Sequence, residues 1–214
     1  MIFLLLRMQK EVVKNLIFDF GGVIANIERD RSVSAFRALG LKDAANYLDP
    51  YHQNGFFLEL EEGRIDADRF CELLGPLCGR NVSFHEAKAA WMAFITDVPE
   101  YRLEYLESLA DRYKLYLLSN TNPFIMDWAR SPHFSGKGKS LGEYFDKLFL
   151  SYELKCVKPD KNIFRHLIAA GLDPRESVFL DDGPANIRAA QNLGFMTLLT
   201  ENGKDWRNQL GELL

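Results

Sequence analysis

The chain has 214 residues, of which 47% are apolar and 26% are charged, and its formal net charge at pH 7 is −4. This composition is typical of a globular protein that buries a sizeable core. It excludes a disordered chain, a collagen-like fibre and a disulfide scaffold. With 26 basic and 30 acidic residues and no run rich in Lys or Arg, we expect no nucleic-acid partner.

The first residues of the chain are apolar, but they are too few to cross a membrane. A spanning helix needs about 20 apolar residues, and no small-residue cleavage site of the kind that ends a signal peptide follows them. We treat residues 1–7 as an N-terminal extension and Met8 as a candidate start. The prediction is a cytoplasmic protein with no membrane partner and no obligate protein partner.

Three cysteines are too few, and odd in number, for a disulfide framework. They are Cys71, Cys78 and Cys156, and the spacing of the first two fits no zinc site. We expect buried thiols in a reducing compartment.

The first short apolar run, residues 15–18, predicts a buried strand, and the segment after it has a different character. Residues 28–97 contain no convincing strand run. They contain helical stretches, one beginning at Asp66 and one at a capping box formed by Ser83 and Glu86. We therefore predict a helical cap over residues 28–97, inserted into a core domain made of residues 8–27 and 98–214.

The rest of the chain alternates between strand and helix patterns. Apolar runs predict strands at residues 114–118, 147–150, 177–180 and 196–199, and helical patterns cover residues 99–111, 160–170 and 184–194. The strand runs are continuous rather than alternating, which suits a parallel sheet covered on both faces. The predicted fold class is a doubly wound, Rossmann-like α/β sheet with a cap after its first strand.

Polar side chains follow the apolar runs, where a parallel sheet binds its ligands. Taken singly, each is more often a turn or cap residue; as an ordered set they indicate a site. The segments are 19–22 (Asp-Phe-Gly-Gly), 119–122 (Ser-Asn-Thr-Asn), 158–159 (Lys-Pro) and 181–183 (Asp-Asp-Gly).

The chemistry of this set indicates a magnesium and phosphate site. Three carboxylates, those of Asp19, Asp181 and Asp182, would repel one another and raise each other's pKa. A divalent cation relieves that repulsion, and oxygen ligands suit Mg²⁺. The cation and Lys158 would attract a phosphate, Ser119 and the groups after it could hold its oxygens, and Asp19 could attack phosphorus.

These residues resemble the four motifs of the haloacid dehalogenase-like (HAD) hydrolase superfamily. The resembling segments are 18–24 (Phe-Asp-Phe-Gly-Gly-Val-Ile), 118–120 (Leu-Ser-Asn), 158–159 (Lys-Pro) and 179–182 (Phe-Leu-Asp-Asp). Their order and spacing cover about residues 15–199, and the insertion lies where that superfamily places a small cap. Within it, the chain resembles subfamily IA phosphatases, in the branch that contains sugar-1-phosphate phosphatases.

The resemblance implies a role for each matched residue. Asp19 would be the nucleophile and a Mg²⁺ ligand, and Gly21 would offer its backbone carbonyl to the ion. Asp182 would be the firmest further ligand, and Asp181 would bind directly or through water. Ser119 and Asn120 would bind the phosphoryl group, and Lys158 would bridge it to Asp19. The implied activity is Mg²⁺-dependent hydrolysis of a small phosphorylated metabolite, such as a sugar phosphate, through an aspartyl-phosphate.

The chain departs from that pattern two residues after the nucleophile. Many phosphatases of the superfamily have there a second aspartate, which acts as general acid and base, whereas this chain has Gly21. Acid–base help contributes about 10²–10⁴-fold. Either the substrate is an anomeric, aryl or acyl phosphate with a good leaving group, or the cap supplies the acid. The candidates in the cap are His52, Glu59 and Glu62.

Other classes of protein fit less well. A receiver domain carries its acidic pair after the first strand rather than the fourth, and it has no place for the insertion. A metal-free dehalogenase has no need of the pair formed by Asp181 and Asp182. The main alternative is a protein with a degenerate site that binds a phosphorylated ligand or a partner without turnover.

Overall fold

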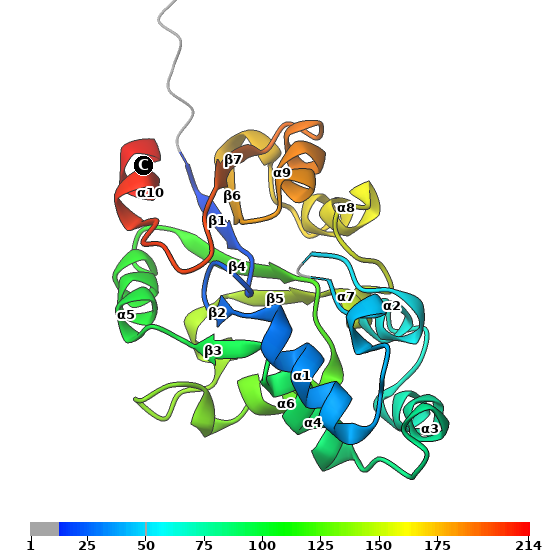
Figure 1. Ribbon diagram of the computed structural model, residues 1–214. Helices are drawn as coiled ribbons and strands as arrows, with labels where there is room; N and C mark the ends of the chain where they lie inside the picture. The colour runs from blue at the N-terminus through cyan, green and yellow to red at the C-terminus, as the bar shows by residue number, and fades with distance from the viewer. Residues whose placement is uncertain (1–12, 50) are drawn as a thin grey trace, which may run out of the picture.

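The computed structural model describes residues 13–49 and 51–214. Its centre is a five-stranded parallel sheet in the order β5-β4-β1-β6-β7 (Figure 1). The strands are β1 (Asn15–Phe18), β4 (Lys114–Ser119), β5 (Lys147–Leu150), β6 (Ser177–Asp181) and β7 (Met196–Leu199). All five predicted strands and the doubly wound fold class are confirmed. The proposed extension over residues 1–7, the candidate start at Met8 and the first residues of the predicted core lie outside the described part.

Successive residues of β1 face opposite sides of the sheet, as the period of a strand requires. Leu16 and Phe18 belong to one apolar cluster, whereas Ile17 belongs to another. The first cluster is completed by helices on one face: α5 (Glu100–Leu109), α6 (Pro123–Ala129) and α10 (Arg207–Leu213). The second is completed by helices on the other face: α8 (Lys161–Ala169) and α9 (Pro184–Gln191). Figure 1 shows α5 and α10 to one side of the sheet and α8 and α9 to the other.

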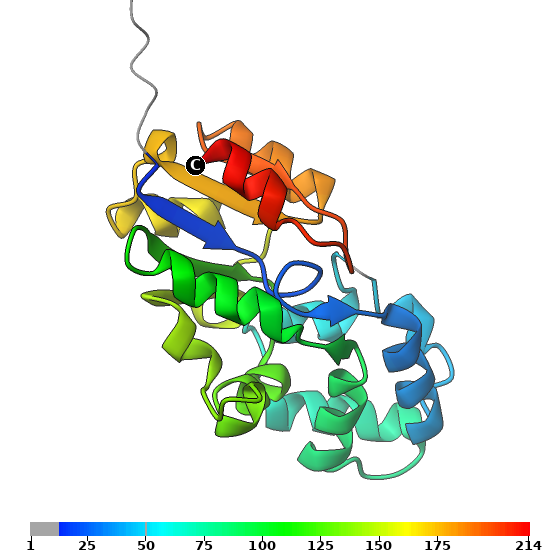
Figure 2. The ribbon, with the colours of Figure 1, turned by 90° about the vertical axis from the view of Figure 1, so that its left-hand side faces the viewer.

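The segment after β1 forms a group of helices beyond the carboxyl end of the sheet, toward which β1 points (Figure 2). They are α1 (Arg29–Leu39), α2 (Gly55–Glu61), α3 (Ala67–Cys78) and α4 (Phe84–Met92). The predicted capping box forms, since the Ser83 side chain accepts from the backbone of Glu86 and the Glu86 side chain accepts from that of Ser83. We call these four helices and their connections the cap, and its exact boundaries stay a prediction.

A short antiparallel ribbon stands at the two ends of the cap. β2 (Asn26–Ile27) pairs with β3 (Ile95–Asp97), and the Asn26 side chain donates to Asp97 at 2.9 Å. The expectation that residues 28–97 contain no strand is therefore wrong at its last residues. A three-residue strand is too short to leave an alternating pattern in the sequence.

Aromatic side chains fill the interior of the cap and continue into the core domain. Phe57 packs against Phe36, Phe70 and Trp91, with ring centroids 4.9–5.2 Å apart. Phe70 also contacts Phe124 of α6, at 5.5 Å between centroids. The cap thus rests on α6, which follows the carboxyl end of β4.

Two buried side chains hold the loop between β1 and β2. The guanidinium of Arg102 donates to the backbone carbonyl of Ile24 and to the Asn26 side chain, at 3.3 and 2.9 Å. The Trp206 indole donates to the carbonyl of Val23 at 2.9 Å. These bonds pair polar groups of the loop that would otherwise be unpaired in the interior, and so they fix the segment that follows β1.

The three cysteines are unpaired and only partly buried. The expectation of buried thiols is wrong in that respect, because all three cysteines pack against the outside of the apolar clusters rather than within them. In the described ranges, no helix has the length and apolar character needed to cross a membrane.

Candidate active site

The ends of two neighbouring strands bring the predicted acidic residues together. Asp19 follows β1, Asp181 ends β6, and Asp182 is the next residue. Each offers a carboxylate oxygen, and these three oxygens lie within 4.8 Å of one another. The parallel arrangement of β1 and β6 produces this cluster, because it places both carboxyl ends at one edge.

Lys158 lies between two of the carboxylates and is almost fully buried. Its Nζ is 2.7 Å from Oδ1 of Asp19 and 2.6 Å from Oδ2 of Asp181. Burial alone would lower the pKa of Lys158, but the charges of Asp181 and Asp19 outweigh it, so the pKa lies above its ordinary value. The lysine is therefore a permanent positive charge at the floor of the site.

Asn120 fixes the backbone of that lysine. Its side chain donates to the carbonyl of Lys158 at 2.9 Å and accepts from the Lys158 amide at 2.7 Å. This pair of bonds joins the end of β4 to a segment 38 residues later in the chain. The side-chain amide of Asn120 thus positions Lys158, and the expectation that Asn120 binds phosphate stays a prediction.

The carboxylate of Asp19 has one occupied oxygen and one open oxygen. Oδ1 accepts from the Phe20 amide at 2.7 Å and from Lys158. Oδ2 accepts no hydrogen bond from the described residues. Burial raises the pKa of Asp19, Lys158 opposes the rise, and the charges of Asp181 and Asp182 add to it. The ionised Asp19 carboxylate is therefore unfavourable unless additional positive charge binds beside it.

The two adjacent aspartates differ in how fully they are bound. Oδ1 of Asp181 accepts from the Gly183 amide and the Asn186 side chain, at 2.7 and 2.9 Å, and Oδ2 accepts from Lys158. Asp182 is less buried, and burial together with the charge of Asp181 raises its pKa to about 6, against the opposing effect of Lys158. Asp182 thus has the freer carboxylate for a ligand, while Asp181 is held in place.

Charge counting shows what this cluster lacks. Three carboxylates face one ammonium, which leaves two negative charges in excess when all are ionised. A divalent cation with oxygen ligands would balance them. The residues present therefore fit a magnesium ion, held by Asp19 and Asp182 with Asp181 nearby.

Gly22 makes room for this arrangement. Its φ of +75° is in the left-handed region, and a Cβ there would lie 2.1 Å from Oδ2 of Asp182. Any side chain at this position would displace the Asp182 carboxylate. Gly21 lines the pocket and has no such conflict, since the nearest atom to an added Cβ is a methyl of Ile27 at 3.4 Å.

Two hydroxyl groups lie at the carboxyl end of β4, and the first belongs to the predicted phosphate-binding residue Ser119. Ser119 ends β4 and is buried, and its hydroxyl donates to the carbonyl of Asn120 at 3.3 Å. Thr121 lines the pocket, and its buried hydroxyl has no hydrogen-bond partner within the described ranges. Thr121 was not among the predicted phosphate-binding residues, although it belongs to the same run of polar residues.

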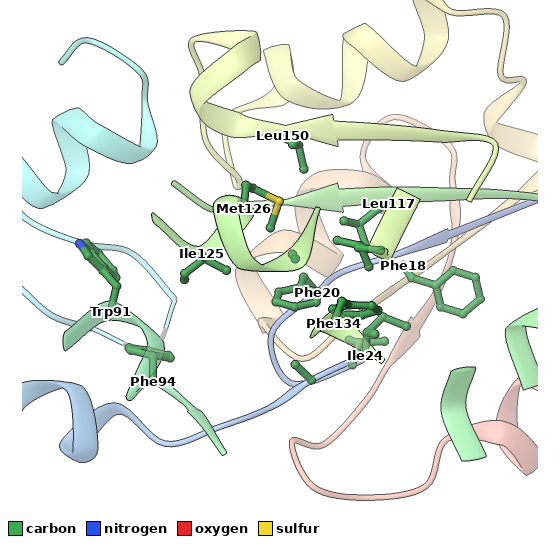
Figure 3. Packing of buried hydrophobic residues seen from close by; sticks show 14 of the residues in the cluster. Phe18, Phe20, Ile24, Trp91, Phe94, Leu117, Ile125, Met126, Phe134 and Leu150 are labelled. Carbon is green, nitrogen blue, oxygen red and sulfur yellow. The ribbon is translucent and has the colours of Figure 1, made fainter. Parts of the chain in front are cut away.

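A pocket of about 630 Å³, with its open mouth included, lies over the acidic cluster and is lined by both the core domain and the cap. Figure 3 shows Trp91 and Phe94 of the cap segment across from Ile125 and Phe20 of the core domain, and all four line the pocket. The cap therefore provides an apolar wall for whatever binds at the cluster.

The cap also places a carboxyl group in this pocket, but it is none of the three predicted candidates. His52 is exposed, and Glu59 and Glu62 form ion pairs with Arg64 at the surface. Glu61 is only 4% exposed and lines the pocket. The feature of the sequence that could have indicated an inward-facing Glu61 is its position four residues after Phe57, because residues four apart lie on one face of a helix and Phe57 is buried.

Comparison with known proteins shows similarity over most of the chain. Residues 13–194 match the family described as haloacid dehalogenase-like hydrolase. A D-ribitol-5-phosphate phosphatase of Bacteroides thetaiotaomicron is 50% identical over 204 residues, which are 95% of this chain and 99% of that protein.

Solved structures agree with that match. A structure described as a predicted HAD-like family hydrolase from Porphyromonas gingivalis superposes with a TM-score of 0.91, at 37% identity, covering 94% of this chain and 98% of the other. A HAD family enzyme from Bacteroides thetaiotaomicron, described as a complex with magnesium and inorganic phosphate, has a TM-score of 0.83 at 36% identity, with 92% and 98% coverage. L-2-haloacid dehalogenase of Xanthobacter autotrophicus, at 20% identity and a TM-score of 0.55, shares the fold.

Proposed function

Since the chain belongs to the haloacid dehalogenase-like hydrolases, we propose that it is a Mg²⁺-dependent phosphatase that acts on an open-chain polyol phosphate through an aspartyl-phosphate on Asp19. The observation that carries the proposal is the charge of the cluster. Asp19 presents an open oxygen beside two further carboxylates and a single buried lysine. That arrangement binds a cation and a phosphate together, and it offers a nucleophile to the phosphorus.

The predicted family and the predicted class of enzyme, a phosphoric monoester hydrolase, are confirmed by the matches to the family and to the named phosphatase. The identity of the substrate is inferred from the named phosphatase. Ribitol phosphate is an open-chain polyol whose phosphate is attached to a primary alcohol. We propose a small polyol or sugar phosphate of that type.

The residues of the cluster would have the following roles. Asp19 would attack phosphorus through Oδ2, while Oδ1 stays bound to the Phe20 amide and Lys158. Lys158 would neutralise charge on the transferring group, and Asn120 would hold that lysine in place. Ser119 and the backbone amides after it would bind phosphoryl oxygens. Such groups stabilise the transition state because they are already oriented before the reaction.

Magnesium would be held by Asp19, Asp182 and the carbonyl of Gly21, with Asp181 directly or through water. When bound, it would supply positive charge that balances the carboxylates and the phosphate. Asp181 accepts three hydrogen bonds and so uses most of its lone pairs, which favours contact through water. The cap would exclude bulk water and contact the organic part of the substrate.

Phosphate release from a panel of esters tests the proposal, with Mg²⁺ and with chelator, for the wild type and for Asp19→Asn. Turnover that chelator and Asp19→Asn both abolish would support it. Absence of turnover across the panel, from protein shown to be folded, would favour a site that binds a phosphorylated ligand without reacting. Turnover that survives chelator would favour metal-free chemistry.

A further inference from the structure

A polyol phosphate has a poor leaving group. When its phosphorus–oxygen bond breaks, the departing alkoxide is strongly basic and needs a proton in the transition state. Gly21 has no side chain to give one, and Lys158 and Asp19 are committed to the transferring phosphate. The proton must therefore come from another group in the pocket.

We propose that Glu61 is the general acid for this reaction, which rests on the proposed phosphatase function. Glu61 ends α2 and lines the same pocket as Asp19, and the charges of Asp19 and Lys158 act on its carboxyl. It is the one carboxyl group that the described residues of the cap contribute to the pocket lining.

The surroundings of Glu61 argue against a purely structural role. A buried carboxyl normally has a hydrogen-bond partner, because leaving it unpaired destabilises the fold. Glu61 is only 4% exposed and lines the pocket, and within residues 13–49 and 51–214 its carboxyl has no hydrogen bond or ion pair; its oxygens are not completely enclosed, so they stay open to the pocket. A substrate oxygen in the pocket would supply the missing partner.

The protonation state also suits an acid. Burial raises the pKa of Glu61 to about 8, and the negative charge of Asp19 adds to the effect while Lys158 opposes it. At neutral pH the group therefore carries a proton that it can donate. Cation binding at the cluster would weaken the contribution of Asp19, but burial is the larger cause.

Other groups in the pocket are poorer candidates. Gln53 is not an acid, and its amide is bound to the backbone of Asp49 through both its oxygen and its nitrogen. Tyr51 is about half exposed, and burial raises the pKa of its phenol, so it holds its proton tightly. Asp182 is needed beside the cation. Glu61 remains as the titratable group that the cluster does not use.

The proton transfer balances over two steps. First, an oxygen of Asp19 bonds to phosphorus as the bond between phosphorus and the substrate oxygen breaks. The substrate oxygen takes the proton of Glu61, and the substrate leaves as the alcohol. Then the Glu61 carboxylate takes a proton from a water molecule, whose oxygen attacks phosphorus. The bond between Asp19 and phosphorus breaks, inorganic phosphate leaves, and both carboxyl groups return to their starting states.

The test compares two substrates that differ in the leaving group. The variants are Glu61→Gln, which keeps the shape of the side chain, and Glu59→Gln, a matched control two residues earlier on the surface of α2. We expect Glu61→Gln to lower kcat/KM for an alditol phosphate about 10²–10⁴-fold. Because p-nitrophenolate leaves without a proton, p-nitrophenyl phosphate should lose only a few-fold. Glu59→Gln should change neither rate.

The outcomes separate the two proposals. Equal losses on both substrates, or a rise in KM alone, would overturn the general acid and leave the phosphatase intact. No turnover of either substrate by the wild type would overturn both. A second measurement needs no variant: wild-type kcat/KM across esters of increasingly acidic alcohols should vary weakly. A steep rise with leaving-group acidity would show that no group donates the proton.

Discussion

Replacing Asp182 by asparagine should make the metal-free protein more stable. Burial and the charge of Asp181 raise the pKa of Asp182 from an ordinary 3.8 to about 6. A carboxyl group whose pKa is higher in the folded state resists ionisation there. Its contribution to folding stability is therefore complete at pH values below its pKa in the unfolded chain, and it is lost as pH rises through its pKa in the folded protein. Between about pH 4 and pH 6 the wild type should therefore lose more stability than the variant, in which only the other buried carboxyl groups, Asp19 and Glu61, resist ionisation.

The magnitude follows from the size of the shift. A difference of about two pH units corresponds to about 3 kcal/mol, at 1.36 kcal/mol per unit. For a domain of this length, 1 kcal/mol shifts the melting temperature by about 2–4 °C, so Asp182→Asn should melt about 6–12 °C above the wild type at pH 7.5. At pH 4 the two should melt at closely similar temperatures.

Thermal unfolding with chelator, at pH 4 and pH 7.5, measures this difference. Asp43→Asn, at an exposed position of the cap, is the matched control and should follow the wild type. Magnesium should raise the melting temperature of the wild type at pH 7.5, and it should have much less effect on Asp182→Asn. A variant that is no more stable than the wild type at pH 7.5, or equally stabilised at both pH values, would refute the reasoning.

Two further substitutions test the floor of the site. Lys158→Met leaves two buried carboxylates without their partner and should lower the free energy of unfolding by about 3–5 kcal/mol in urea titrations without metal; a loss below about 1 kcal/mol would contradict the buried ion pairs. Gly22→Ala should push the Asp182 carboxylate aside and weaken Mg²⁺ binding about 10–100-fold in calorimetry. Its control is Gly203→Ala, which has a similar φ of +81° but open space around the added Cβ; equal affinities in the two variants would rule out the steric argument.

The sequence was sufficient to predict the sheet and the cluster at its edge because both depend on local patterns. Continuous apolar runs mark strands that are buried on both faces, and a parallel sheet gathers the residues that follow them. Asp19, Lys158 and Asp181 were therefore predictable as neighbours without any structure. The strand of three residues at Ile95–Asp97 was not, since its pairing with β2 is set by tertiary contacts.

The contribution of the cap depends on packing that no short motif records. Three glutamates, Glu59, Glu61 and Glu62, lie within four residues of one another. Only the packing of α2 against its aromatic neighbours decides that Glu61 lines the pocket while the other two form ion pairs with Arg64. The use of Asn120 to hold Lys158 is equally non-local, because it joins segments 38 residues apart. Contacts between side chains of different elements were the ones that the sequence alone could not predict.

The pocket offers two places from which an acid could reach the leaving group, and this chain uses only one of them. Gly21 lines the same pocket as Glu61, and an added Cβ there would meet only Ile27 at an ordinary contact distance. In the Glu61→Gln background, Gly21→Asp should therefore fold and should restore alditol phosphate turnover at least about 10-fold, within the range of acid–base help. Gly21→Asn in the same background is the control, because its amide has the same shape but cannot donate a proton to an alkoxide. Rescue by both variants would indicate a packing effect, and rescue by neither would show that a carboxyl at this position cannot reach the substrate oxygen.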